Sequence, residues 1–229
     1  MKKFVFKNSF FIITMIVFVA LTTVFYQFVA ISASRYNGVT IVLDAGHGGR
    51  DGGSIGVNGT IEKELNLEYV LSLKDKLVKK GYRVELTRKN DDGLYSLTDK
   101  NKKTSDMKER LKIIKRANPN MVISVHMNSF ADSSAKGATT YYRKGDESGK
   151  VCADLIQKSL HEYCGARFYD GKVGDFYMVN SSYYTCVLIE CGFISNPEEE
   201  KLLNSDSYKN KFTDAVANAV MLYFGQKNV

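Results

Sequence analysis

The sequence has 229 residues, 44% of them hydrophobic and 25% charged, with a formal net charge of +7 and a pI near 9.1. The hydrophobic share is enough for one full core, which excludes a disordered chain. The positive charge suits an anionic partner. No run of Lys or Arg alternates with aromatic residues, however, so nucleic acid is not the expected partner.

Residues 1–35 predict a signal peptide or an N-terminal membrane anchor. Three lysines within the first seven residues precede an uncharged stretch, 8–34. Its apolar part, 10–31, is longer than the roughly 7 to 15 residues of a secretory signal and close to the roughly 20 that span a bilayer. Small residues at 30 and 32–34 suit signal peptidase, so cleavage and retention both stay open. In either case we expect residues 36–229 to be exported as one domain.

Strands and helices alternate after this segment. Runs of β-branched and apolar residues predict strands, and apolar stripes with a period of 3.6 predict helices. The predicted strands are 39–43, 82–87, 121–126, 138–142 and 186–189; the predicted helices are 64–80, 106–117, 147–163 and a C-terminal pair that ends with 208–224. This order predicts a single α/β domain, with a mostly parallel or mixed twisted sheet covered by helices on both faces.

Four polar residues lie where ligands of such a sheet gather. His47, His126 and Glu190 follow or end three different strands, and Glu62 lies at or just before a helix start. Carboxyl ends of strands form the ligand-binding edge of open α/β sheets, so these side chains can converge. Two imidazoles and one carboxylate are typical protein ligands of a catalytic zinc ion, and a further carboxylate can act as a base. This combination of residue types would make the protein a metal-dependent hydrolase, with ordinary polar loop residues as the alternative. The spacing alone is only weakly diagnostic, because no short local motif places two ligands on one helical turn.

The cysteines predict free thiols. Cys152, Cys164, Cys186 and Cys191 all lie in the last third of a chain that is large enough to fold without bridges. A bridge between Cys152 and Cys164 stays open, but buried thiols are favoured. Cys186 or Cys191 could instead be the nucleophile of a cysteine hydrolase, although no orienting third group is evident.

Four stretches carry a resemblance to a known family: DAGHGGRDGGSIGVNGTIEKELNL, ELTR, ERLKIIKRANPNMVISVHMNSF and VLIECGFISNPEEEKLL. In order and separation they resemble the motifs of the zinc-dependent N-acetylmuramoyl-L-alanine amidases, over essentially all of the chain after Tyr36. The resemblance implies that His47, Glu62 and His126 bind Zn²⁺ and that Glu190 is the catalytic carboxylate. The short chain resembles in particular the spore-cortex amidases that help to form muramic-δ-lactam.

The resemblance implies that residues 36–229 are a peptidoglycan hydrolase. It would cleave the amide between the lactyl group of N-acetylmuramic acid and L-alanine of the stem peptide. The alternatives are a vegetative autolysin or cell-separation amidase, and a wall-binding module without catalysis. Arg88 and Asn128, near strand ends, are candidate contacts to the muropeptide, with structural roles as the alternative. Asp44 is a candidate to orient an imidazole, with a turn or capping role as the alternative.

Four further expectations concern regulation and the less conspicuous residues. Some amidases of this family carry a helical plug before the catalytic glutamate, but residues 127–189 leave little room for one, so control by expression, by location or by an accessory envelope protein is expected instead. A cortex role also implies a peptidoglycan deacetylase as functional partner. His161 is expected to be an ordinary helical histidine. Tyr177, Tyr183 and Tyr184 are expected to pack at the core or rim, with stacking on sugars as the alternative.

Overall fold

The computed structural model describes residues 11, 13–24 and 36–227. The chain divides into two compact units, Met1–Asn37 and Gly38–Val229. In the first unit residues 13–24 are helical, and none of the helices in the described residues combines the length and apolarity needed to cross a bilayer. The predicted leader, 1–35, lies largely outside the described residues, and its role stays a prediction.

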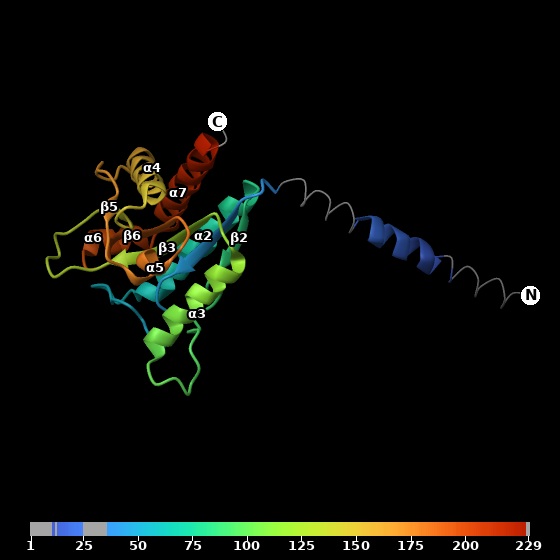
Figure 1. Cartoon of the computed structure of the whole chain (residues 1–229), viewed down its shortest axis with the longest axis horizontal. Helices are drawn as coiled ribbons and strands as arrows, with labels where there is room; N and C mark the ends of the chain where they lie inside the picture. The colour runs from blue at the N-terminus through green and yellow to red at the C-terminus, as the bar shows by residue number, and fades with distance from the viewer. Residues whose placement is uncertain (1–10, 12, 25–35, 228–229) are drawn as a thin grey trace, which may run out of the picture. The chain divides into compact units, whose positions relative to one another are not determined.

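The second unit alternates strands and helices as the sequence predicts (Figure 1). Its elements are β1 (Thr40–Ala45), α2 (Glu62–Lys79), β2 (Arg83–Leu86), α3 (Lys102–Ala117), β3 (Met121–Asn128), β4 (Thr139–Tyr142), α4 (Glu147–Cys164), β5 (Lys172–Val173), α5 (Tyr177–Ser181), β6 (Cys186–Phe193), α6 (Pro197–Leu203) and α7 (Asp206–Lys227). The short elements β5 and α5 were not predicted. Helix α3 begins four residues before the predicted start, because the Asn101 side chain caps it by accepting a hydrogen bond from the Thr104 amide at 3.0 Å.

The six strands of residues 36–227 form one mixed sheet in the order β2-β1-β3-β6-β4-β5. Strands β2, β1, β3 and β6 are parallel to one another, while β4 is antiparallel to β6 and parallel to β5. The register places His126 of β3 directly beside Glu190 of β6. The parallel part of the sheet therefore brings two of the predicted site residues onto neighbouring strands.

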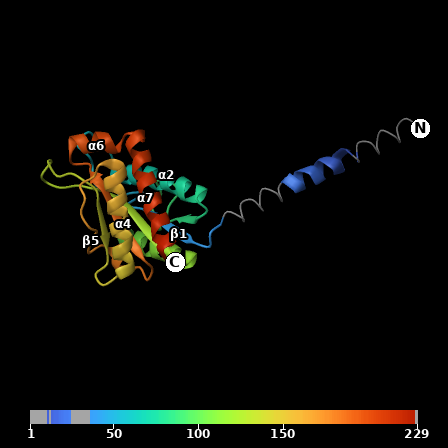
Figure 2. The same ribbon diagram turned by 90° about the horizontal axis from the view of Figure 1, so that it is seen from above.

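Helices cover both faces of the sheet, which confirms the predicted fold class. Ile41, Leu43 and Ala45 of β1 pack in a large core with residues of α2, α4 and α7, whereas Val42 packs in a smaller core with residues of α3 and α5. The alternation follows from the two-residue period of a strand. Figure 2 shows α4 and α7 side by side on one face. The ends of β1, β3 and β6 are thus held between two packed layers.

All four cysteines are free thiols, as predicted. Cys152, Cys186 and Cys191 are buried, and Cys164 is partly buried. The second unit is therefore held by its hydrophobic cores rather than by covalent links.

A buried ion pair joins β1 to α3. Asp44 and Arg110 are each 1% exposed, and Nη1 of Arg110 donates to Oδ1 of Asp44 at 2.7 Å. Thr87 and Ser124 donate their hydroxyls to the same carboxylate at 2.7 and 2.6 Å. Burial alone would raise the pKa of Asp44, but Arg110 and the two hydroxyls outweigh it and lower the pKa from 3.8 to about 2.

We expect Asp44→Asn to destabilise the fold by about 3 kcal/mol, because Arg110 stays buried with less compensating charge. Urea unfolding measures the change, and Glu85→Gln, in an exposed pair with Arg83 at 3.2 Å, is the control with a loss below about 1 kcal/mol. Since the folded-state pKa of Asp44 is depressed, its contribution is present above pH 4 or so and is lost as pH falls toward about 2. Equal losses in the two variants would contradict this role.

Candidate metal centre

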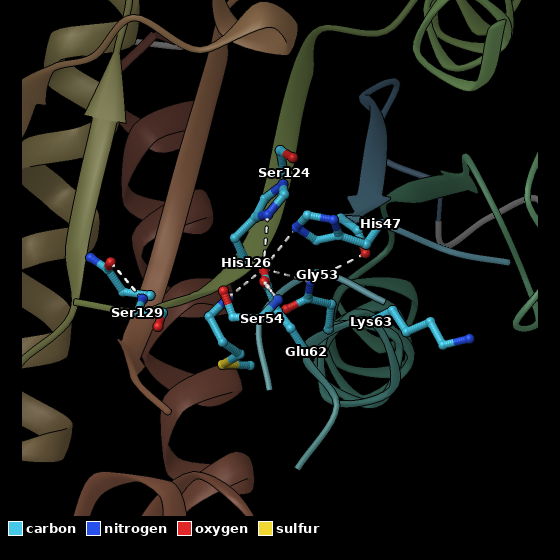
Figure 3. Close-up of polar contacts among 12 residues, drawn as sticks. His47, Gly53, Ser54, Glu62, Lys63, Ser124, His126 and Ser129 are labelled. Atoms are coloured by element: carbon cyan, nitrogen blue, oxygen red, sulfur yellow. Dashed lines mark hydrogen bonds and ion pairs between the residues drawn. The ribbon is translucent and has the colours of Figure 1, made fainter. Parts of the chain in front are cut away.

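Three side chains from distant segments meet beside the parallel strands. His47 follows β1, Glu62 is the first residue of α2, and His126 belongs to β3. Nε2 of His47 and Nδ1 of His126 each lie 3.1 Å from the same oxygen, Oε1 of Glu62. Figure 3 shows the Glu62 carboxylate between the two imidazoles. One ligand atom from each of the three residues lies within 4.8 Å of the others.

The donor set fits a zinc ion. It consists of two imidazole nitrogens and one carboxylate oxygen, the set found in catalytic zinc sites with an open fourth position. All three side chains are largely shielded, at 19%, 4% and 19% exposure for His47, Glu62 and His126. Their role as zinc ligands stays a prediction, which this geometry supports.

The electrostatics keep Glu62 ionised. Burial alone would raise the pKa of Glu62, yet hydrogen bonds and charge from His126 and His47 outweigh it and lower the pKa. The other carboxylate oxygen, Oε2, accepts the Ser54 amide at 2.8 Å. For His47, burial would lower the pKa, but Glu62 and Asp51 raise it. In its ionised form Glu62 is suited to bind a divalent cation.

Glu190 differs from Glu62 in its surroundings. It lies beside His126 on the neighbouring strand, and its Oε2 atom is buried without a hydrogen-bond partner. Burial, the largest influence, raises the pKa of Glu190 to about 7, against the opposing charge of His126. A carboxyl group that titrates near neutrality can both accept and return a proton.

Two glycines make room for the ligands. A Cβ atom on Gly46 would lie 2.2 Å from the His126 ring, and one on Gly53 would lie 2.4 Å from Oε2 of Glu62. Gly53 also has a φ of +70°, which other residues rarely adopt. The glycine-rich loop therefore lets ligands from α2 and β3 approach its backbone closely.

Two buried arginines hold the same loop. Arg110 donates to the carbonyl oxygens of Ala45 and His47 as well as to Asp44. Arg88 donates to the carbonyls of Ala45, Gly46, Lys63 and Asn90. The two guanidinium groups thus bind backbone carbonyls of the loop, of β1 and of α2 around the metal centre.

These contacts change the interpretation of two sequence candidates. Arg88 is 3% exposed, and four of its five N–H donors bind backbone carbonyls, so the structural alternative holds and we propose no substrate contact for it. Asp44 accepts from Arg110, Thr87 and Ser124 rather than orienting an imidazole. Asp51, which the sequence reasoning missed, lies 3.0 Å from Nδ1 of His47 and is the better candidate for that role. The sequence did offer one signal for this role, an acidic residue four positions after His47.

The remaining sequence candidates differ in their exposure and in their contacts. Asn128 ends β3 half-buried, and its side chain accepts the Ser129 amide at 2.8 Å, so its contact to substrate stays a prediction. His161 is exposed in α4 with Nδ1 2.7 Å from the Ala166 carbonyl, as expected of an ordinary helical histidine. Tyr184 packs against the smaller core, as expected, whereas Tyr183 is 96% exposed and Tyr177 is 48% exposed. These two do not lie in the core, and packing at the rim or stacking on sugars stays a prediction for them.

The acidic run in α6 anchors two loops around the centre. Glu200 accepts the amides of Asn58 and Thr60, just before Glu62, at 2.7 and 3.1 Å. Glu199 accepts the amides of Gly137 and Phe193 at 2.9 and 2.8 Å. The partners of these carboxylates lie far along the chain, so the sequence pattern alone does not reveal the contacts.

Comparison with known proteins gives consistent matches. The family profile described as N-acetylmuramoyl-L-alanine amidase matches residues 41–221. The germination-specific N-acetylmuramoyl-L-alanine amidase of Bacillus subtilis is 33% identical, and the match covers 83% of this chain and 82% of that protein. The N-acetylmuramoyl-L-alanine amidase LytC of the same organism is also 33% identical, and the match covers 82% of this chain and 36% of that protein. Among solved structures, the CwlD amidase from Clostridioides difficile, in complex with the GerS lipoprotein, has a TM-score of 0.79 and 35% identity, covering 82% of this chain and 99% of that one.

We expect Gly46→Ala to lower the affinity for zinc at least tenfold, because the added methyl group displaces the His126 ring. Elemental analysis after dialysis at graded zinc concentrations measures the effect. Gly225→Ala is the matched control, since an added Cβ there meets nothing within 4 Å. If Gly46→Ala holds as much zinc as the control while remaining folded by circular dichroism, the close approach has no role in the site.

Proposed function

This chain belongs to the N-acetylmuramoyl-L-alanine amidase family, and we propose that it is a zinc-dependent member that removes stem peptides from spore-cortex peptidoglycan. The activity is that of the family: hydrolysis of the amide between N-acetylmuramic acid and L-alanine in peptidoglycan. Because peptidoglycan lies beyond the cytoplasmic membrane, the enzyme acts outside the cytoplasm. The observation that carries the proposed site is the meeting of His47, Glu62 and His126 beside the buried, unpartnered Oε2 of Glu190.

The proposed ligands are His47, Glu62 and His126. Zinc, when bound, acts as a Lewis acid that polarises a carbonyl and lowers the pKa of water. The two imidazoles are held by loop and strand, while Ser54 and Asn66 donate to the Glu62 carboxylate at 2.8 and 3.3 Å. These contacts fix the ligand atoms before substrate arrives.

Glu190 is the proposed general base and acid. It takes a proton from the attacking water at a carboxylate oxygen and returns a proton to the nitrogen of L-alanine as the C–N bond breaks. The products are the lactyl carboxylic acid and the free amine of the peptide. A covalent intermediate is not needed, because one carboxyl group carries out both proton transfers.

The cortex assignment rests on the relatives. The Bacillus subtilis relative is named as germination-specific, and it covers most of both chains. LytC reaches the same 33% identity, so a role in the vegetative wall is the second candidate. In the cortex role the product is muramic acid freed of peptide, which a deacetylase must process before the lactam can close.

We also propose control by an accessory envelope protein. The solved CwlD amidase, 35% identical, is in a complex with a lipoprotein, which supports the proposal. Residues 127–189 hold β4, α4, β5 and α5, and the long helix among them, α4, packs against α7. The segment thus contains no long helix free to plug the centre. Full activity of the isolated protein on purified wall would argue against an obligatory partner.

The cortex assignment predicts different rates of product release from spore cortex and from vegetative peptidoglycan. Mass spectrometry of digests should show peptide-free muramic acid from spore cortex at a clearly higher rate than from vegetative peptidoglycan at equal substrate. Equal rates, or faster release from the vegetative wall, would favour the autolysin alternative.

We expect Glu190→Gln to lower turnover by roughly 10²- to 10⁴-fold, because the amide cannot accept a proton. Zinc content and the unfolding midpoint should match those of the unchanged protein. Glu162→Gln, at an exposed position on α4, is the control and should retain full turnover. Undiminished turnover by Glu190→Gln would eliminate this assignment of the base.

We expect EDTA to abolish hydrolysis, added zinc to restore it, and iodoacetamide to leave it unchanged. The thiols of Cys186 and Cys191 are buried, and burial raises the pKa of both well above the ordinary value, so neither forms a reactive thiolate. Release of L-alanine amino groups from purified wall is the assay. The reverse pattern, with inhibition by iodoacetamide alone, would support a cysteine hydrolase.

A further inference from the structure

A cavity of about 490 Å³ adjoins the metal centre. His47 and His126 line it at one side. Tyr95 lines it from the loop before α3, Lys102 and Lys103 line it from the first turn of α3, and Phe176 and Tyr177 line it from the start of α5. Its volume lies within the roughly 300 to 1,000 Å³ of small-ligand sites. Neither of the two segments was assigned a function above.

The acidic side chains of this cavity are already partnered. Asp44 and Asp106 bind Arg110 at 2.7 and 2.6 Å, and Asp51 lies 3.0 Å from His47. Asp175 accepts the side-chain amide of Asn180 at 2.7 Å. Arg110 thus offsets part of this negative charge, while the carboxylate of Asp175, next to α5, has a neutral amide as its partner.

The cationic side chains are less engaged. Nζ of Lys102 reaches only the carbonyls of Leu97 and Asp99, at 3.3 and 3.4 Å. The Lys103 side chain is 74% exposed, and its Nζ is 3.9 Å from Asp51. Arg50 also lines the cavity and is exposed. Lys102 and Arg50 thus line the cavity without an ion pair among the described residues, so positive charge is available there to an anionic ligand.

The two lysines occupy a position that does not help the helix. They are the first residues of α3, where the partial positive charge of a helix end favours acidic residues, and this first turn contains none. Helix stability therefore does not account for two adjacent cations at this end. An anionic ligand in the neighbouring cavity would.

We propose that this cavity receives the peptide side of the substrate, and that Lys102 and Lys103 bind the carboxylate of the residue that follows L-alanine. The inference rests on the proposed amidase function and adds a basis for specificity. In intact peptidoglycan the lactyl carboxyl group is tied up in the scissile amide, so the sugar strand is neutral and the carboxylates belong to the peptide. One residue spans about 3.3 to 3.6 Å, which keeps the second residue close to the reacting carbonyl.

The aromatic side chains complete the arrangement. The Tyr177 side chain is 48% exposed, and Phe176 is held by the ring of Tyr141, with ring centroids 5.0 Å apart. Nζ of Lys102 lies 6.0 Å from the ring centroid of Tyr95. Tyr95 in turn accepts the Arg50 amide through its hydroxyl at 2.9 Å. The apolar faces are suited to the peptide backbone and the L-alanine methyl group, while the cations lie at the α3 side.

The test compares two preparations of uncross-linked peptidoglycan chains. In one the α-carboxylate of the second stem residue is free, and in the other it is an amide. The protein and a Lys102→Gln/Lys103→Gln variant are assayed on both by release of L-alanine amino groups. Lys108→Gln/Lys112→Gln is the matched control, because it removes the same charge from exposed positions of α3 that do not line the cavity.

We expect the unchanged protein and the control to prefer the free carboxylate by roughly 3- to 10-fold in kcat/KM. This is the size of effect expected when Lys102 and Lys103 each form a partly exposed ion pair with the substrate. The preference should arise from KM and shrink at high salt. In Lys102→Gln/Lys103→Gln the ratio of kcat/KM values should fall toward one. An unchanged ratio in this variant, or no preference in the unchanged protein, would overturn the inference.

The outcomes separate this inference from the amidase assignment. Failure of the unchanged protein to release amino groups from either preparation would count against the proposed function itself. Release from both without discrimination would leave that function in place and remove only the role of Lys102 and Lys103. A shift in preference with sugar-strand length instead would assign the cavity to the glycan.

Discussion

The guanidinium of Arg110 lies where β1, α3 and the glycine-rich loop meet, and the position of the first histidine depends on it. It is ion-paired to Asp44 and Asp106 and donates to the carbonyls of Ala45 and His47. A guanidinium with fixed, planar donors suits such a junction better than a flexible ammonium group. Because the charge is buried, loss of either carboxylate leaves it poorly compensated. The loop therefore cannot change its conformation without disturbing the core. We expect the metal centre to unfold together with the rest of the domain, in one cooperative transition.

Around this junction the ligands are positioned by contacts that are remote in sequence. Gly46 lies against the ring of His126, Gly53 lies against the carboxylate of Glu62, and Glu200 of α6 holds the amides just before Glu62. Each of these contacts constrains a different ligand. Together they keep two imidazoles and a carboxylate close enough for one cation, although the loop that connects β1 to α2 has little regular structure.

The sequence predicted the elements with strong periodicity and the residues at the ends of strands. It singled out His47, His126 and Glu190 in this way, because parallel strands deliver their ends to one edge, and it placed Glu62 at a helix start. The structure brings these side chains together, while their roles as zinc ligands and base stay predictions. It did not predict β5 and α5, which are too short to show a period. It left a substrate contact and a structural role open for Arg88, since only the fold reveals that its donors meet backbone carbonyls. Asp51, Arg110 and Glu200 were missed for the same reason, because their partners are defined by tertiary contacts.

The two borders of the sheet have a consequence for self-association. Strand β5 has two residues, and β2 has four, with the charged side chains of Arg83 and Glu85 on the strand. Short, charged border strands offer a poor template for pairing with another chain. An enzyme that accumulates along an insoluble polymer reaches high local density, where intermolecular sheet growth would otherwise compete with turnover. The blunt borders of this sheet let many copies crowd on one wall without joining into fibrils.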